Sequence, residues 1–178
     1  MVERRIAIYL TNLGKYNEGC LMGEWVKLPV DKDKLQEVLD RIGINQQYEE
    51  YFISDYETLF ANLHISEYAS INDLNELAER VDGLADYDYE KLAAVLECES
   101  SMSIAEILEV IDNLDNFDLL ADVEDDEALG EYYADVGCIF HNIPDSIQRY
   151  FDFEAYGRDV RLESNMCFTS YGVVIDNR

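Results

Sequence analysis

The stretch 103–112, SIAEILEVID, carries the clearest structural pattern in the chain. Its apolar residues recur at the 3.6-residue period of a helix with one buried face, and they are Ile104, Ile107, Leu108 and Ile111. Ser103 and Glu106 have the spacing of a capping box, which predicts that the helix begins after Ser103. The carboxylates of Glu106, Glu109 and Asp112 fall on the opposite side and are expected to face solvent.

Two further amphipathic helices are predicted before this stretch. The first begins after Ser70, and its apolar face consists of Ile71, Leu74, Leu77, Ala78 and Val81. The second has an apolar face made of Tyr89, Leu92, Ala93 and Leu96. With the helix at 103–112, they predict a central acidic helical domain that covers residues 61–114.

Before residue 60 the hydrophobic pattern has the period of two that is typical of strands. Strands are predicted at 5–10, around 25–28 and near 51–53, and the segment 12–19 is rich in turn-forming residues. A helix capped by Asp31 or Asp33 is expected to run to about Ile42 and to end at Gly43. Residues 1–60 are therefore predicted to form a small antiparallel sheet with a helix.

The last part of the chain, residues 115–178, is predicted to be an α/β domain with a dimer surface. A strand is expected at 117–121, and a helix capped by Asp125 or Asp126 should end at Gly137. Pro144 is expected to open one more helix, which carries Ile147, Tyr150, Phe151 and Glu154. A terminal hairpin is predicted at 166–175, so the fold class is α+β in an elongated chain of three domains.

Negative charge is concentrated in one part of the sequence. Between Asp82 and Asp135 there are eighteen carboxylates, and Lys91 is the one basic residue there. The net charge is −17 for 82–135, out of −26 for the whole chain. Concentrated charge of one sign destabilises a fold through self-repulsion, so a protein that keeps it usually has an electrostatic use for it.

The composition limits the classes of partner. The sequence pI near 4.1 argues against binding to nucleic acid or to an anionic membrane surface, because both repel a polyanion. A hydrophobic content of 48% is high enough for the chain to fold. The four cysteines contain no C-x-x-C pair, and no apolar segment is long enough for a signal peptide or a membrane span, which predicts free thiols and a cytoplasmic protein.

The acidic residues allow more than one interpretation. Glu127, Glu131 and Asp135 recur every four residues with no cation at pairing distance along the helix, which is locally unfavourable by about 0.2–0.5 kcal/mol per like-charge neighbour. Such a row is either an ordinary solvated face or a surface that binds an external cation. B-DNA has one charge per about 1.7 Å of duplex axis. The 26 net negative charges would therefore match about 44 Å of duplex, so a charge-matched substitute for DNA is possible.

Other function classes have less support in the residues. Asp86, Asp88, Glu90 and Glu97 resemble the ligands of a calcium-binding loop, but Lys91 occupies the position that needs glycine. Cys138 and His141 form a single C-x-x-H pair, which is more often structural than catalytic. The sequence therefore predicts no catalytic residue, metal site or cofactor. A metal- or polyamine-binding acidic protein remains the alternative.

Several segments together resemble the ArdA antirestriction proteins of plasmids and conjugative transposons. They are 13–19 (LGKYNEG), 48–51 (YEEY), 55–57 (DYE), the pair Tyr132–Tyr133 before Gly137, and 153–159 (FEAYGRD). The resemblance implies a dimeric DNA mimic that occupies the DNA-binding groove of type I restriction-modification enzymes, at their methyltransferase core. It implies an inhibitor from a mobile genetic element that has no enzymatic activity.

The resemblance and the charge pattern together give a set of candidate residues. The carboxylates expected to mimic phosphates are Glu106, Glu109, Asp112, Asp115, Asp118, Asp122, Asp125, Asp126, Glu127, Glu131 and Asp135. The side chains expected at a two-fold dimer interface are Tyr132, Tyr133, Phe140 and Phe151.

Overall fold

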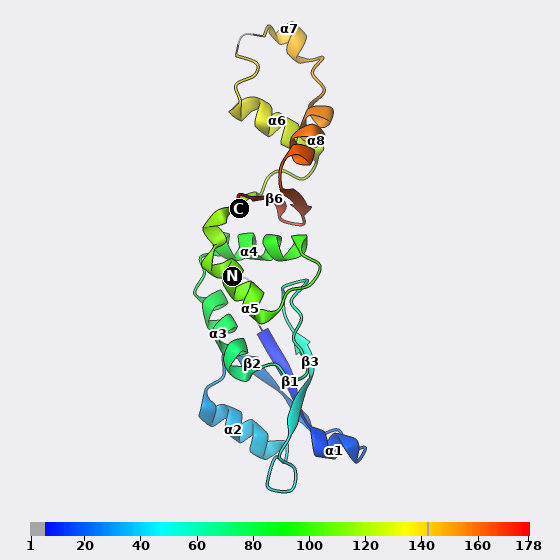
Figure 1. The fold of residues 1–178 in the computed structure, drawn as a ribbon, viewed down its shortest axis with the longest axis vertical. Helices are drawn as coiled ribbons and strands as arrows, with labels where there is room; N and C mark the ends of the chain where they lie inside the picture. The colour runs from blue at the N-terminus through cyan, green and yellow to red at the C-terminus, as the bar shows by residue number, and fades with distance from the viewer. Residues whose placement is uncertain (1–5, 142) are drawn as a thin grey trace. The chain divides into compact units, whose positions relative to one another are not determined.

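The computed structural model describes residues 6–141 and 143–178 (Figure 1). These residues divide into two compact units. Unit 1 comprises residues up to 85 together with 101–112, and unit 2 comprises 86–100 together with 113–178. The mixture of helices and small antiparallel sheets confirms the expected α+β composition. The expected division into three domains is not confirmed, because the helices of 61–114 are shared between the two units.

Unit 1 is built on a three-stranded antiparallel sheet. Its strands are β1 (Ile6–Asn12), β2 (Gly23–Leu28) and β3 (Tyr51–Glu57), in the order β2-β1-β3. β1 lies in the middle and is buried on both faces, which explains its continuous apolar run. The three strands confirm the predicted strand positions, although Arg5, predicted in the first strand, lies outside the described residues.

The helices of unit 1 are α1 (Leu13–Asn17), α2 (Lys32–Arg41), α3 (Ile71–Asp82) and α5 (Ile104–Asp112). The predicted caps are correct: the side chains of Asp31 and Ser70 accept from the backbone amides of Lys34 and Asp73. α3 and α5 pack together through a core that includes Leu74, Leu77 and Ile107. The segment 12–19, expected to consist of turns, contains the short helix α1 because Asn12 caps it.

Unit 2 begins with α4 (Asp86–Cys98) and continues with a 3₁₀ turn at Leu114–Asn116 and a second antiparallel sheet. The sheet contains β4 (Phe117–Leu120), β5 (Met166–Thr169) and β6 (Gly172–Asp176), in the order β4-β6-β5. α4 packs against all three strands, with Leu92 and Leu96 fully buried. The predicted terminal hairpin is confirmed, and Gly172 has the positive φ of 119° that its turn requires.

The rest of unit 2 consists of α6 (Asp126–Val136), the short helix α7 (Asp145–Gln148) and α8 (Phe153–Glu163). α6 and α8 lie side by side (Figure 1) and cross at two glycines, Gly130 and Gly157. A Cβ on Gly130 would overlap the carbonyl of Phe153, and one on Gly157 would overlap the carbonyl of Asp126. The two backbones are therefore in direct contact.

The prediction of one helix opened by Pro144 and continuing through Glu154 is wrong. α7 ends at Gln148, and α8 starts anew after Asp152, whose side chain accepts from the Ala155 amide at 2.9 Å. The side-chain cap of Asp152 offers the backbone a separate helix start, so the apolar residues from Ile147 to Phe151 do not form one helical face. Among the described residues, no helix has the length and apolar character that a membrane crossing requires.

Candidate functional site

The acidic stretch lies on the surface of both units. Its carboxylate residues between Asp82 and Asp135 are all exposed, except that Asp88, Glu97 and Asp126 are half-buried. Lys91, the one basic residue of the stretch, is only 7% exposed, and its ammonium lies 5.5 Å from the centre of the Tyr87 ring. The single positive charge of the stretch is therefore mostly buried, and the exposed surface remains strongly negative.

The three candidate carboxylates of α5 have different surroundings. Glu106 closes the predicted capping box: its Oε2 accepts from the Ser103 hydroxyl at 2.6 Å and from the Ser103 amide at 2.7 Å. These two bonds hold the pKa of Glu106 below its usual value, so it is ionised at neutral pH. Asp112 forms an ion pair with Arg80 of α3. Glu109 is exposed on the same helix.

The candidates at the start of α6 also take part in local structure. Asp125 is the cap of the helix, since its Oδ1 accepts from the Ala128 amide at 2.8 Å. Asp126 is held by both arms of the Arg161 guanidinium, at 2.8 and 3.0 Å, and these hydrogen bonds lower its pKa. Because Arg161 already pairs with Asp126, this carboxylate is less available to an external cation.

Glu127, Glu131 and Asp135 form the row that the sequence predicted on α6, and we call these three residues the α6 row. All three side chains are exposed, whereas Leu129, Gly130 and Ala134 on the other side of the helix are buried. Within 6–141 and 143–178, no lysine or arginine lies within ion-pair distance of the row. Residues four apart on a helix are about 5–6 Å apart at Cβ, so the row is a dense line of negative charge.

The remaining candidates lie on the strand and the connections before α6. Asp115, Asp118 and Asp122 are exposed, and Asp118 accepts a hydrogen bond of 2.8 Å from the Asn177 amide group. The amide group of Asn177 is neutral, so this hydrogen bond does not cancel the negative charge of Asp118. These aspartates therefore add to the negative surface of unit 2.

The basic residues of unit 2 are occupied within the unit. Arg161 binds Asp126, Arg178 binds Asp176 at 2.8 Å, and Arg158 lies 3.6 Å from Asp159. Arg149 donates to the carbonyl of Ser146 at 3.0 Å. Unit 2 has 20 acidic and 5 basic residues, so the local pairs leave a large surplus of carboxylates.

The predicted dimer residues do not all share one environment. Tyr132 and Tyr133 stack edge to face on α6 at 5.3 Å, with Tyr132 39% exposed. Phe140 and Phe151 are half-buried and pack edge to face, with their ring centres 5.1 Å apart. Other apolar side chains of this segment are exposed, which the sequence analysis did not predict: Val136, Ile139, Ile143, Ile147 and Tyr150. The sequence analysis placed Ile147 and Tyr150 on a helix and gave the other three no role.

The residues that resemble calcium ligands have other roles in the structure. Asp86, Asp88 and Glu90 belong to the first turns of α4 rather than to a loop. Glu97 accepts from the amide and the hydroxyl of Ser170 at 2.7 and 2.6 Å. Among the described residues, no group of three or more histidine, cysteine, aspartate or glutamate side chains is arranged to hold a metal ion.

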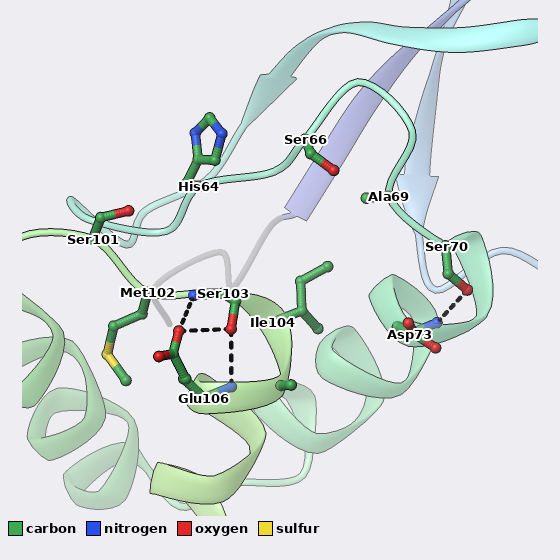
Figure 2. Close-up of a pocket in the computed structure, with 11 residues that line it drawn as sticks. His64, Ser66, Ala69, Ser70, Asp73, Ser101, Met102, Ser103, Ile104 and Glu106 are labelled. Atoms are coloured by element: carbon green, nitrogen blue, oxygen red, sulfur yellow. Dashed lines mark hydrogen bonds between the residues drawn. The ribbon is translucent and has the colours of Figure 1, made fainter.

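An open hollow of about 490 Å³ lies beside the starts of α3 and α5 (Figure 2). Ser70 and Ser103 line it, and both hydroxyls are engaged in capping their helices. Glu106 and Asp73 give it negative charge, and the His64 ring points away from the Glu106 carboxylate. The hollow does not bring a nucleophile and a base together.

The motif 13–19 and Tyr48 form a structural cluster in unit 1. The Tyr48 ring lies against Gly14, where a Cβ would overlap it. The Lys15 ammonium donates to the Tyr48 hydroxyl at 2.8 Å and to Glu18 at 3.0 Å, and these bonds raise the pKa of Lys15. The motif therefore joins α1 to the turn before β3.

A family model described as antirestriction protein (ArdA) matches residues 8–175 of the chain. The match covers nearly all of both units, including the α6 row and the segments around Gly14 and Gly157. No curated protein matches the sequence.

Proposed function

The chain belongs to the ArdA family of antirestriction proteins, and from this premise we propose that it inhibits type I restriction-modification enzymes by mimicking DNA. Its exposed carboxylates stand in for the phosphates of a B-form duplex and occupy the DNA-binding groove of the methyltransferase core. The protein and DNA then compete for one surface. The inhibitor performs no chemistry of its own.

The observation that carries this proposal is the surplus of exposed carboxylates that lack an internal counter-charge. The α6 row has no cation within the described residues, and the arginines of unit 2 are occupied by other groups. A helix with like charges every four residues is destabilised by itself, so the row gains most when it meets a cationic surface. Lysine and arginine side chains that bind phosphates supply such a surface.

We further propose that the protein forms a two-fold dimer through the exposed apolar residues between Val136 and Tyr150, close to Phe140 and Phe151. A two-fold contact uses the same patch on both copies, and burial of apolar side chains is its driving force. Two copies would double the number of carboxylates that one enzyme meets and would extend the duplex that is mimicked.

The direct test is competition for a purified type I methyltransferase bound to fluorescent DNA at low salt. The wild-type protein should displace the DNA completely. The variant E127Q/E131Q/D135N should require about a tenfold higher concentration for the same displacement. Each exposed pair contributes about 0–1 kcal/mol, and a total near 1.4 kcal/mol is tenfold in affinity. Each single change of the row should alter the affinity less than about threefold.

The matched control is D40N/E57Q/E67Q, which removes the same charge from exposed positions of unit 1. It should compete almost as well as the wild type. Equal losses in the two triple variants would mean that net charge alone acts. Failure of the wild-type protein to displace DNA at any concentration would disprove competitive mimicry.

The dimer has its own test in solution. Light scattering at micromolar concentration should give twice the chain mass of 20.6 kDa. Replacing Ile147 and Tyr150 with aspartate should give the monomer mass, because charge would enter an apolar contact. The same change at Tyr68, which is 70% exposed in unit 1, is the control and should leave the dimer intact. A wild-type monomer at this concentration would rule the dimer out.

A further inference from the structure

Two of the four cysteines meet inside unit 2. Cys98 is the last residue of α4, Cys167 lies on β5, and α4 packs against β5. Both thiols are free and half-buried. Phe168 packs against Leu129 and Val173 on one face of the sheet, so its neighbour Cys167 lies on the opposite face, near enough to Cys98 to affect the pKa of that thiol. Cys20 and Cys138 are exposed instead. The packing of α4 against β5 therefore brings two oxidisable side chains from distant parts of the sequence close together.

The pair lies close to the point where the chain of unit 2 is interrupted. The unit consists of the segments 86–100 and 113–178, and the chain between them belongs to unit 1. Cys98 lies just before the chain leaves unit 2. Packing and the bonds from Ser170 to the Glu97 carboxylate hold the end of α4 on the second segment. A covalent bond here would join the two segments directly.

We infer that Cys98 and Cys167 are a redox modification site, which closes to an intramolecular disulfide when a low-molecular-weight disulfide such as oxidised glutathione is present. One cysteine loses its proton and attacks the external disulfide, which forms a mixed disulfide and releases one thiol. The second cysteine loses its proton and displaces the second external thiol. Two cysteine thiols are oxidised, and one external disulfide is reduced to two thiols.

The geometry favours this product over two mixed disulfides. A disulfide needs Cβ atoms about 3.5–4.5 Å apart, and the packing of α4 against β5, together with the bonds between Glu97 and Ser170, brings the two side chains toward that arrangement. Both residues are half-buried, so a bulky mixed disulfide is disfavoured there. The second displacement is intramolecular and follows readily on the first.

The surroundings of Cys98 also determine how fast the disulfide forms. Burial, and then the contact with Cys167, raise the pKa of the Cys98 thiol well above its usual range. The thiolate is the attacking form, so closure is slow at neutral pH and becomes faster in alkaline solution. The pair therefore stays reduced in a reducing compartment and closes under sustained oxidation.

The experiment uses the full chain with C20S/C138S, which leaves only the proposed pair. After incubation with oxidised glutathione, thiol titration in denaturant should show both thiols lost, and peptide mapping should show Cys98 linked to Cys167. The melting temperature should rise by roughly 5–10 °C, because the bond constrains the unfolded chain. Adding dithiothreitol should reverse both changes.

The controls carry one further change each, C98S or C167S, in the same background. Each should take up at most one glutathione and should melt at the temperature of its own reduced form. Two glutathione molecules on the C20S/C138S protein, or disulfide-linked copies of the chain, would overturn the proposal. Two thiols that remain free under oxidation at alkaline pH would overturn it as well.

Discussion

Raising the salt concentration from about 50 to 200 mM is expected to lower the affinity of this protein for a type I methyltransferase on the order of 100- to 1,000-fold. Proteins that make six to ten phosphate contacts with DNA lose about 10³–10⁵ in affinity over the same range. The carboxylates of a folded protein are less dense than phosphates, so we expect a loss at or below the lower end of that range. The logarithm of the affinity should fall steadily as the logarithm of the salt concentration rises.

The measurement is direct binding of the labelled protein to the enzyme without DNA, because salt also weakens the competing DNA complex. The variant E127Q/E131Q/D135N should bind more weakly at low salt and should show a shallower salt dependence. Light scattering at each salt concentration checks that the assembly state is constant. An affinity that stays within about twofold across the series would exclude charge mimicry, because exposed charges are screened at these concentrations.

The second large effect is expected from Gly157→Ala at the crossing of α6 and α8. The new methyl group would meet the carbonyl of Asp126 and the amide of Gly130, which are backbone atoms that no side-chain rotation can move away. Overpacking costs typically about 1–3 kcal/mol and sometimes more. Alanine is otherwise favoured over glycine in a helix by about 0.5–1 kcal/mol, so a loss here reverses the usual sign. We expect a decrease of about 3 kcal/mol in the free energy of unfolding.

Calorimetry should show this loss as a melting temperature that is lower by roughly 6–12 °C, on the scale of 2–4 °C per kcal/mol for a chain of this size. Gly83→Ala is the matched control, because its Cβ would lie 3.5 Å from the nearest atoms, which is ordinary contact. It should change the melting temperature by only a few degrees. If Gly157→Ala melted with the wild type, the close crossing of the two helices would be wrong.

The same variant connects the fold to the proposed function. α6 carries the α6 row, and its position depends on the contact with α8. Hydrogen exchange should therefore become faster in α6 and α8 of Gly157→Ala, while β1 in unit 1 keeps its protection.

Local sequence signals predicted the helix ends well. Ser70, Ser103 and Asp125 cap helices as expected, because capping joins a side chain to an amide three residues further on. The prediction was wrong after Pro144, where the apolar residues from Ile147 to Phe151 suggested one continuous helix. The cap at Asp152 starts a separate helix, and the exposed side chains of Ile139, Ile143 and Tyr150 lie in the segments between helices.

The candidate carboxylates were predictable only in part. Their exposure followed from the helical period, which places them away from the apolar face. Their ion pairs could not be predicted from this period, because Arg80 and Arg161 reach Asp112 and Asp126 from other helices. The close contact at Gly130 and Gly157 was also missed, since an isolated glycine in a helix gives no sign of the backbone that will lie against it.

The sequence by itself determined the excess of negative charge, the periods of the strands and helices, and the start of most helices. These properties depend on residues within one or two turns of each other. The tertiary structure alone decided which carboxylates keep their full charge, which glycines allow α6 and α8 to touch, and which two cysteines meet. Arg161 and Asp126 are 35 residues apart, and such a pair exists only after packing brings the two helices together.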